Sequence, residues 1–411
     1  MTAVLEARTP HVVVIGAGAA GLMAAAAARE AGAHVTLVER TTDGGRKILI
    51  SGGGRCNVLP SQSAPARFVS EAPRTLVRAL LEAWPLREQR RFFEHELGLP
   101  LALDEATGKL FPVSNRARDV RDALVARARA LGVTLRFGLA VSAVRRDAAG
   151  WIVCGDTGDL PCDRVIVATG GLSVPATGST GFGLDLARAF GHVVQPTYAA
   201  LTPLTTVPAV HATLAGVSLD VRLDARSGRE RARGAGGFLF THRGYSGPAV
   251  LDVSHVAVRS QWPGAERAEV DVCWTAMEAA GWRDVLADAR GRVTSAVARH
   301  LPQRLAEVLV REAEVPEDRT CVQLRRDERA RLLRVLTEYP LPWTGDESYR
   351  TAEVTGGGVA LDEVHRGTLE SRRTPGLYFC GEVLDAFGPI GGHNFSWAWS
   401  TGRTAGHAAG A

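Results

Sequence analysis

The stretch that decides the fold is VVVIGAGAAGLMAAAAAREAGAHVTLVE, residues 12–39. It begins with a β-branched run at residues 12–15, which is typical of a buried parallel strand. An alanine-rich segment that suits a helix follows to about Ala31, and Gly32 stands where it can end that helix. Residues 34–38 have the composition of a second strand. The order strand, helix, strand predicts a βαβ unit of an α/β protein.

Three glycines join the first strand to the helix in G-x-G-x-x-G spacing. Gly16 permits a tight turn, Gly18 lets the backbone approach a pyrophosphate, and Gly21 lets the helix pack closely on the strand. The helix N-terminus, with Ala19 and Ala20 in its first turn, offers free N–H groups to phosphate oxygens. The motif lies between a strand and a helix, so it predicts dinucleotide binding.

Glu39 ends the second strand, where an acid can accept hydrogen bonds from a ribose diol. An acid rather than an arginine at this position argues against NADP, but it suits both NAD and FAD. The alternative is an ordinary βαβ unit with a glycine-rich turn, in which Glu39 is a solvated strand end.

The composition is that of an ordinary globular protein and excludes several classes. The chain has 411 residues, enough for two or three domains, with 45% hydrophobic and 22% charged residues. A net charge of only +4 gives no strong surface for nucleic acid or membranes. No apolar run reaches the length of a transmembrane helix, and the first ten residues lack the apolar core of a signal peptide.

The six cysteines form neither a C-x-x-C pair nor a metal-binding spacing. We therefore expect a reduced, cytoplasmic protein without a metal site. No feature of the sequence indicates an oligomeric state.

A second glycine-rich stretch, GGRKILISGGGRCNV at residues 44–58, contains three consecutive glycines among cationic side chains. Such a loop can place backbone N–H groups on a phosphate or on the edge of a flavin. A solvated loop is the alternative. The candidate cofactor contacts here are Arg40, Arg46, Lys47, Ser51, Gly52, Gly53, Gly54, Arg55, Cys56 and Asn57.

Residues 73–97 and 116–131 have helical periodicity, and the pattern then changes to short strands. The strand-like stretches are 133–138, 141–146, 151–155 and 163–168, and they indicate a three-stranded meander that returns to a parallel strand. The returning strand ends in a glycine-rich turn that can pass close to a nucleotide. Its candidate contacts are Ala168, Thr169 and Gly170.

The last part of the chain, like the first, has a strand, a glycine-rich turn and a helix in succession. A strand that ends in Gly381 and Glu382 suits a backbone contact to the pyrophosphate and an acid near the ribityl chain. A glycine pair at 391–392 then opens a helix, whose N-terminal dipole can stabilise negative charge on a reduced flavin. The candidate contacts are Gly381, Glu382, Asp385, Gly391, Gly392, His393 and Asn394.

These motifs together identify a resemblance to the BaiN/YhiN-type bacterial flavoproteins, a family of NAD(P)/FAD-dependent oxidoreductases. The matching stretches are GAGAAG (16–21), KILISGGGRCNV (47–58), KLFPVSNRARDV (109–120), ATGGLSVPATGSTGFG (168–183), LFTHRGYSGPAVLDVS (239–254), EVTGGGV (353–359), TLES (368–371) and LYFCGEVLDAFGPIGGHNFSWAWSTG (377–402). The resemblance implies a glutathione-reductase-type Rossmann FAD-binding domain, with Glu39 on the adenosine ribose. It also implies an inserted β-barrel-like plus helical region. We expect FAD-domain parts at 1–195 and 345–411, and a substrate or cap region at 196–344.

The resemblance also implies an activity, the NAD(P)H-driven reduction of a C=C bond or enone in a small organic substrate. NAD(P)H is then a transient electron donor. His393 and Phe395 stand where many relatives have Tyr and Leu, which indicates a distinct subgroup. The candidate catalytic residues are His242, Tyr245, His393 and Cys56. A satisfied structural histidine is the alternative for His242, and a small packing residue is the alternative for Cys56.

Two other functions stay open at the level of sequence. One is a flavin monooxygenase or oxidase. The other is a non-catalytic flavin-binding protein. Its association with RNA is supported only by the arginine-rich inserted region, which includes the arginine-rich segment at residues 222–233. We expect a small-molecule substrate, no nucleic acid and no membrane.

Overall fold

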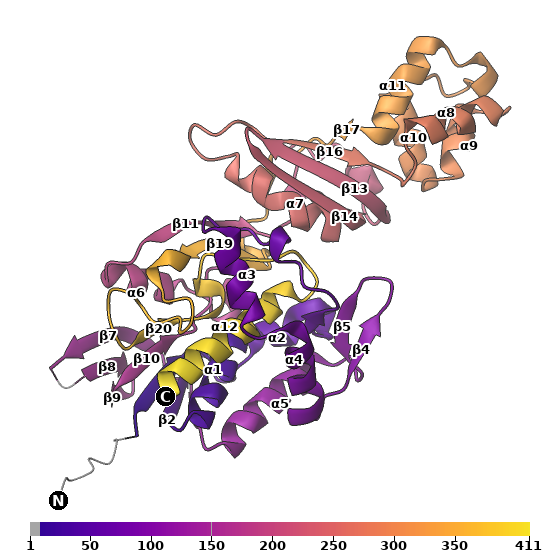
Figure 1. Ribbon diagram of the computed structural model, residues 1–411. Coiled ribbons are helices and arrows are strands. Elements are labelled where there is room, and N and C mark those ends of the chain that lie inside the picture. The colour runs from indigo at the N-terminus through magenta and orange to yellow at the C-terminus, as the bar shows by residue number, and fades with distance from the viewer. Residues whose placement is uncertain (1–8, 149) are drawn as a thin grey trace, which may run out of the picture. The chain divides into compact units, whose positions relative to one another are not determined.

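The computed structural model describes residues 9–148 and 150–411, which form two compact units (Figure 1). Unit 1 comprises the chain up to Thr197 together with Val354–Ala411, and unit 2 is Tyr198–Glu353. Just past the predicted limit at residue 344, β18 (Gly345–Asp346) pairs with β12 (Leu204–Thr205). The pairing places these residues in unit 2.

Unit 1 is built on a parallel sheet with the strand order β20-β10-β1-β2-β6. The strands are β1 (His11–Ile15), β2 (His34–Glu39), β6 (Thr134–Phe137), β10 (Arg164–Val167) and β20 (Leu377–Phe379). The central β1 is a continuous apolar run because both of its faces are covered, and Val12 to Val14 are fully buried. The predicted Rossmann architecture is confirmed.

Two helices, α1 (Ala19–Glu30) and α12 (His393–Gly410), lie along each other in unit 1 (Figure 1). Glycines at every fourth position of α12 make this contact unusually close. A Cβ atom added at these glycines would lie 2.3 to 2.4 Å from a carbonyl oxygen of α1. The pairs are Gly402 with Ala20, Gly406 with Ala24, and Gly410 with Ala28. Small residues on both helices therefore bring the two backbones together.

An antiparallel meander connects β6 to β10 and corrects part of the strand prediction. Its strands are β7 (Val141–Asp147), β8 (Gly150–Gly155) and β9 (Gly158–Cys162). The stretch 133–138 was predicted as the first strand of the meander, but β6 instead extends the parallel sheet beside β2. Strand β9 was not predicted from the sequence, because its sequence GDLPC contains Gly, Asp and Pro, which are depleted in strands.

The other elements of unit 1 surround this sheet. The helices are α2 (Arg46–Ile50), α3 (Arg74–Glu82), α4 (Leu86–Arg91), a π-helical turn (Phe92–Glu96), α5 (Ala117–Ala130) and α6 (Phe182–Ala189). A small antiparallel sheet contains β3 (Leu59–Pro60), β4 (Leu101–Asp104) and β5 (Lys109–Pro112). A two-stranded sheet is formed by β11 (Val194–Ala200) and β19 (Val354–Val359).

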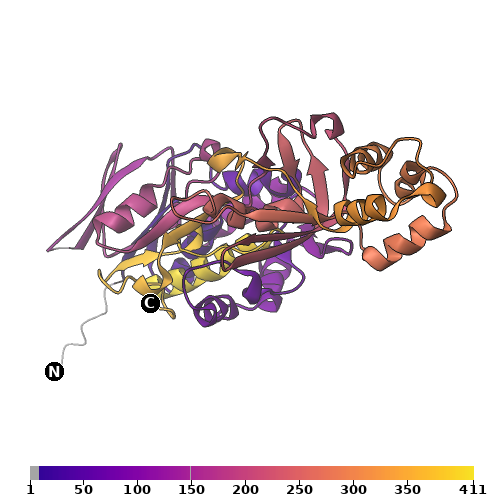
Figure 2. The same cartoon turned by 90° about the horizontal axis from the view of Figure 1, so that it is seen from above.

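Unit 2 contains a seven-stranded antiparallel sheet in the order β17-β16-β13-β14-β15-β12-β18. Its further strands are β13 (Ser218–Ser227), β14 (Glu230–Phe240), β15 (Gly244–Ser246), β16 (Glu269–Cys273) and β17 (Tyr339–Pro340). Helix α7 (Pro248–Arg259) packs on β13 and β14, where Gly234 allows close contact with Ala249. A helical part is inserted in the chain between β16 and β17 (Figures 1 and 2): α8 (Ala279–Asp288), α9 (Val293–Ala298), α10 (Gln303–Glu312) and α11 (Arg326–Thr337).

Candidate cofactor site

The N-terminus of α1 has the form of a nucleotide cradle. A Cβ atom added at Gly16 would lie 2.5 Å from the Ala168 oxygen, and one at Gly21 would lie 1.8 Å from the Gly16 oxygen. Gly18 differs, because a Cβ atom there would meet no protein atom within 4 Å. Gly18 is also the N-cap of α1 and gives no side-chain cap to the helix. The site therefore combines open space with free N–H groups, as a bound pyrophosphate requires.

Glu39 is held in place at the end of β2. Its Oε2 accepts a hydrogen bond from the Ala17 N–H at 2.9 Å. Its Oε1 accepts from the Thr41 N–H at 2.8 Å and from the Thr41 hydroxyl at 2.7 Å. The half-buried carboxylate is thus oriented beside the glycine turn, and a carboxylate has further lone pairs for a ribose hydroxyl.

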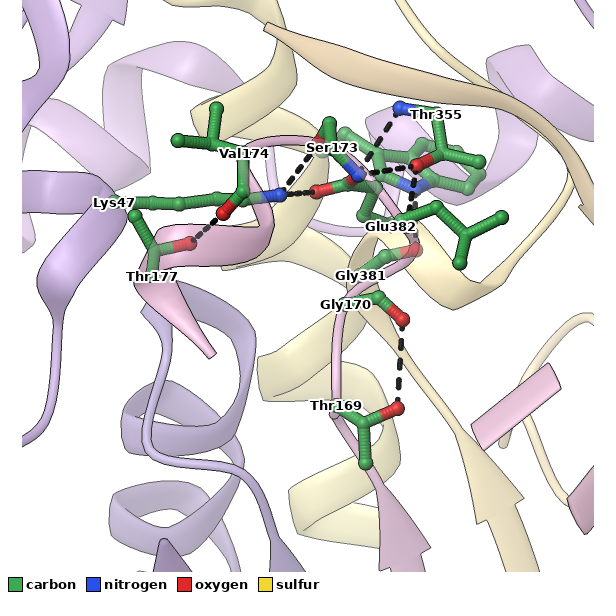
Figure 3. A network of polar contacts seen from close by, with 11 residues as sticks. Lys47, Thr169, Gly170, Ser173, Val174, Thr177, Thr355, Gly381 and Glu382 are labelled. Carbon is green, nitrogen blue, oxygen red and sulfur yellow. Dashed lines mark hydrogen bonds and ion pairs between the residues drawn. The ribbon is translucent and has the colours of Figure 1, made fainter. Parts of the chain in front are cut away.

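Glu382 is the centre of a polar network (Figure 3). Its Oε2 lies 2.6 Å from Lys47 Nζ, and Lys47 also donates to Ser173 Oγ at 2.6 Å. Its Oε1 accepts from the Ser173 hydroxyl at 2.5 Å. The Thr355 N–H and hydroxyl also donate to Oε1, at 3.0 and 2.9 Å.

This network controls the charge of Glu382. Burial alone would raise the pKa of the carboxyl group. The charge of Lys47 and the hydrogen bonds from Lys47, Ser173 and Thr355 lower the pKa by more than burial raises it. The pKa is therefore held below its usual value. The network keeps a carboxylate at the carboxyl end of the parallel sheet, the edge at which α/β proteins bind ligands.

Glycines bring this network close to α1. A Cβ atom at Gly381 would lie 2.7 Å from Ala20 Cβ, in the first turn of α1. A Cβ atom at Gly171 would lie 2.3 Å from Thr355 Oγ1, and the space at Gly170 borders Glu382. The structure thus brings together three separate predicted stretches, the α1 turn, residues 168–170 and residues 381–382.

The SGGG loop is an exposed turn in which three consecutive glycines are left-handed. The φ angles of Gly52, Gly53 and Gly54 are 56, 66 and 84°, a region that other residues rarely adopt. Arg55 places its guanidinium over the ring of Phe111, 4.2 Å from the centroid. Arg40, which precedes this stretch, is exposed. The half-buried Arg46 pairs with Asp43 at 2.8 Å.

After the exposed Arg55, residues 56–60 are buried. Burial raises the pKa of the Cys56 thiol to about 12, despite a hydrogen bond with Ser51 that lowers it. Cys56 is therefore a neutral thiol at physiological pH. With its amide oriented to satisfy both partners, Asn57 accepts from the Gly392 N–H at 3.0 Å and so joins the loop to α12.

The first turn of α12 holds the remaining predicted contacts. His393 is buried with its ring edge-on to Phe68, and burial with the nearby charge of Arg67 lowers its pKa to about 4. It is therefore a neutral imidazole. The Asn394 side chain exchanges two hydrogen bonds with the backbone of Gly388. Asp385 accepts from the Ser70 hydroxyl and the Glu71 N–H.

The two remaining catalytic candidates lie in unit 2. His242 is exposed. Tyr245 is fully buried in β15, and its hydroxyl lies 2.9 Å from His211 Nδ1. His211 in turn forms hydrogen bonds with Glu312 and Tyr339, and the Tyr339 hydroxyl donates a hydrogen bond to Glu312. This cluster joins α10 to the sheet of unit 2.

Several residues of the site were not found by sequence reasoning. Ser173 lies three positions after Gly170, and the periodicity of helices and strands does not indicate that it belongs to the site. Thr355 reaches Glu382 only through the fold, from the glycine-rich strand β19. Among residues 9–148 and 150–411, no group of three or more His, Cys, Asp or Glu side chains could hold a metal ion.

The arginine-rich strands of unit 2 are charge-balanced. Arg222 pairs with Glu278, Arg226 with Glu269, and Arg233 with Asp224, at 2.8 to 2.9 Å. No helix in the described part of the chain is both long and apolar enough to cross a membrane.

Comparison with known proteins places this site in context. The model of the HI0933-like protein Rossmann domain family matches residues 10–408. The chain is 37% identical to the ribosomal RNA dihydrouridine synthase of Escherichia coli (strain K12), over 95% of each protein. It is 33% identical to the 3-dehydro-bile acid delta(4,6)-reductase of Clostridium scindens, over 96% of this chain and 98% of that one.

Among solved structures, the fold resembles that of a flavocytochrome c3 fumarate reductase. The TM-score is 0.51 at 18% sequence identity, over 98% of this chain and 78% of that one. This likeness concerns the fold.

Proposed function

The chain belongs to the HI0933-like Rossmann-domain family of FAD-dependent oxidoreductases, and we propose from this premise that it reduces a C=C bond conjugated to a carbonyl group. The observation that carries the cofactor part of the proposal is the cradle at Gly18, which is open beside an oriented Glu39. The reaction is supported by the names of two relatives. Bound FAD would supply the hydride chemistry. NAD(P)H is the proposed source of the electrons.

The names of the two relatives support a common reaction. Dihydrouridine differs from uridine by saturation of a ring C=C bond that is conjugated to a carbonyl group. A 3-oxo steroid with double bonds at positions 4 and 6 is likewise a conjugated enone. Both reactions add a hydride to one carbon and a proton to its neighbour, so one flavin site can serve both.

Uridine in ribosomal RNA is the first candidate substrate, because the E. coli relative shares 37% identity over 95% of both chains. A small organic enone is the second candidate. It is favoured by the 33% identity to the bile acid reductase and by the ion pairs of Arg222, Arg226 and Arg233 in unit 2, which make these three arginines less available to phosphates.

The chain's own residues have distinct tasks in this proposal. The α1 N-terminus and Gly18 would bind the pyrophosphate, and Glu39 would bind the adenosine ribose. Glu382, held by Lys47, would orient the ribityl chain through its remaining lone pairs. Mutagenesis of the predicted candidates would identify the proton donor. These candidates are His242, Tyr245, His393 and Cys56. Cys56 is the weakest of them because its thiol is buried and neutral.

The test begins with the purified protein, whose flavin absorbance is followed under anaerobic mixing with NADH or NADPH. The reduced enzyme is then given unmodified ribosomal RNA or a panel of cyclic enones. Mass spectrometry should detect a product heavier by two hydrogens with one of the two substrate classes. A protein that binds FAD, yet reduces neither class with either donor or with chemical reductant, would overturn the proposal.

A further inference from the structure

The helical part of unit 2 is rich in arginine. It comprises α8 to α11, and these four helices lie together at one end of the unit (Figure 1). Among residues 9–148 and 150–411, five of its arginines have no hydrogen-bond or ion-pair partner for their side chains. We call these five the arginine cluster: Arg290, Arg292, Arg299, Arg326 and Arg329.

Two segments that are hydrogen-bonded to each other bring the first two members of the cluster to Cys321. The Cys321 N–H donates to the Gly291 oxygen at 3.0 Å, and Arg292 pairs with Thr320 in an isolated β-bridge. The two arginines that flank Gly291 in the chain therefore lie beside the backbone at Cys321.

The thiol of Cys321 locates two further members of the cluster. Burial raises the pKa of this thiol, and the charges of Arg329 and Arg299 oppose the rise because both guanidinium groups lie near the sulfur. Arg329 belongs to α11, and Arg326 lies about one turn before it on the same helix. The cluster therefore gathers around Cys321 from three segments of the helical part.

The acids at the start of α11 do not neutralise the cluster, because other arginines bind them. Asp327 pairs with Arg331 at 3.0 Å, and Glu328 pairs with Arg319 at 3.0 Å. Three exposed acids in the neighbouring segments have no ion-pair partner in the described part of the chain: Asp288, Glu317 and Asp318. Five arginines against three acids leave an excess of positive charge around Cys321.

The cluster is accessible to a large partner. Arg329 is half-buried, and the other four members are exposed. Val322, at the same turn, is 67% exposed and adds an apolar contact beside the charges. A guanidinium group without a carboxylate partner can bind a phosphate through two parallel hydrogen bonds, and its plane can stack on a base. This surface therefore fits the backbone of a nucleic acid.

We propose that the arginine cluster binds the phosphate backbone of the RNA whose uridine is reduced. The inference rests on the proposed function with ribosomal RNA as the substrate. Phosphate contacts fix the position and orientation of a nucleic acid without reading its sequence, so they can lie away from the reacting base. The cluster belongs to unit 2 and the cofactor cradle to unit 1, so loss of the cluster should leave FAD binding unchanged.

The test measures the affinity of the full-length protein for ribosomal RNA transcribed in vitro, by filter binding over a range of salt concentrations. The double variant Arg299→Gln/Arg326→Gln should bind about 25-fold more weakly in about 0.1 M salt, because each lost phosphate contact costs about fivefold there. The slope of the logarithm of affinity against the logarithm of salt concentration should become shallower by about 1.4. Arg299→Lys/Arg326→Lys should retain most of the affinity, because both charges are kept.

The matched control is Arg222→Gln/Arg226→Gln, which removes two charges from the sheet of the same unit, where both arginines have carboxylate partners. This control should lose much less affinity than the cluster variant. If it loses as much, or if the cluster variant binds RNA as the wild type does, the cluster is not the RNA site. If polyglutamate competes as strongly as RNA for the wild type, the partner is an acidic protein segment and the proposal is overturned.

Reduction of a cyclic enone by the same proteins separates this inference from the proposed function. The cluster variant should reduce the enone as the wild type does. A wild type that reduces enones but binds no RNA overturns the inference and leaves the reductase function standing. A wild type that binds RNA through the cluster, yet reduces neither RNA nor enones, overturns the proposed function alone.

Discussion

Replacing Gly18 with alanine should separate cofactor binding from folding. Gly18 has φ −77° and ψ −170°, which any residue can adopt, and its added Cβ would meet no protein atom within 4 Å. Alanine is a poorer N-cap than glycine, so the unfolding free energy of the apoprotein should fall by no more than about 1 kcal/mol. The folded apoprotein should therefore be almost unchanged.

FAD affinity should respond very differently to this substitution. If the pyrophosphate lies against the Gly18 backbone, a methyl group intrudes on it, and an inserted methyl in a packed contact costs about 1–3 kcal/mol. This corresponds to FAD binding that is about 5- to 150-fold weaker. Titration of apoprotein with FAD by fluorescence, beside urea unfolding of the apoprotein, measures both quantities.

The comparison variant is Gly21→Ala, whose Cβ would lie 1.8 Å from the Gly16 oxygen and should destabilise the fold itself. If Gly18→Ala binds FAD as the wild type does, the assignment of this open space to the pyrophosphate is refuted.

Four further substitutions or treatments test other parts of the structure. Glu39→Ala should weaken FAD binding about tenfold through loss of the ribose contact; retention of full affinity in the same titration would contradict the assignment. Lys47→Met should lower the unfolding free energy by about 2–3 kcal/mol near neutral pH, because it removes the partner of a carboxylate whose side chain is 18% exposed. Since the pKa of Glu382 is lowered on folding, this stabilisation is present above the ordinary value of 4.5 and is lost as the pH falls below it. The difference between wild type and variant in urea unfolding should therefore shrink from pH 6 to pH 3, and a constant difference would refute the linkage. Gly406→Val should destabilise unit 1 by about 3 kcal/mol and speed hydrogen exchange in α1, because its Cβ would lie 2.3 Å from an α1 carbonyl oxygen. Cys56, with its pKa raised to about 12, should resist iodoacetamide at pH 8 in the native protein and react after denaturation, as peptide mass spectrometry can detect.

The sequence predicts the fold well wherever the signal is local. The strand, the glycine turn and the alanine-rich helix at residues 12–39 are neighbours in the chain, and the structure confirms them as β1, α1 and β2. Family membership and a Rossmann-type FAD domain are also confirmed. Each of these predictions rests on motifs of about ten to thirty residues, whose physical meaning does not depend on the rest of the fold.

The remaining features depend on contacts between distant segments. Ser173 and Thr355 donate hydrogen bonds to the same carboxylate oxygen of Glu382, although the three residues come from three different stretches of the chain. The hydroxyl of Tyr245 is satisfied by His211, a pairing that no periodicity indicates. Strand β18 is only two residues long and pairs with β12, which lies far away in the sequence, so no local pattern indicates it. The catalytic residues and the ribose and flavin contacts stay predictions.

The packing of α12 on α1 has a consequence for the order of events during synthesis. Helix α1 leaves the ribosome early, but its glycine-contacted face and its neighbour Gly381 are supplied by residues 377–410. Until those residues emerge, the apolar side of the nascent βαβ unit lacks its cover. Cofactor loading should therefore follow the synthesis of residues 377–410, and until then the exposed apolar surface favours aggregation.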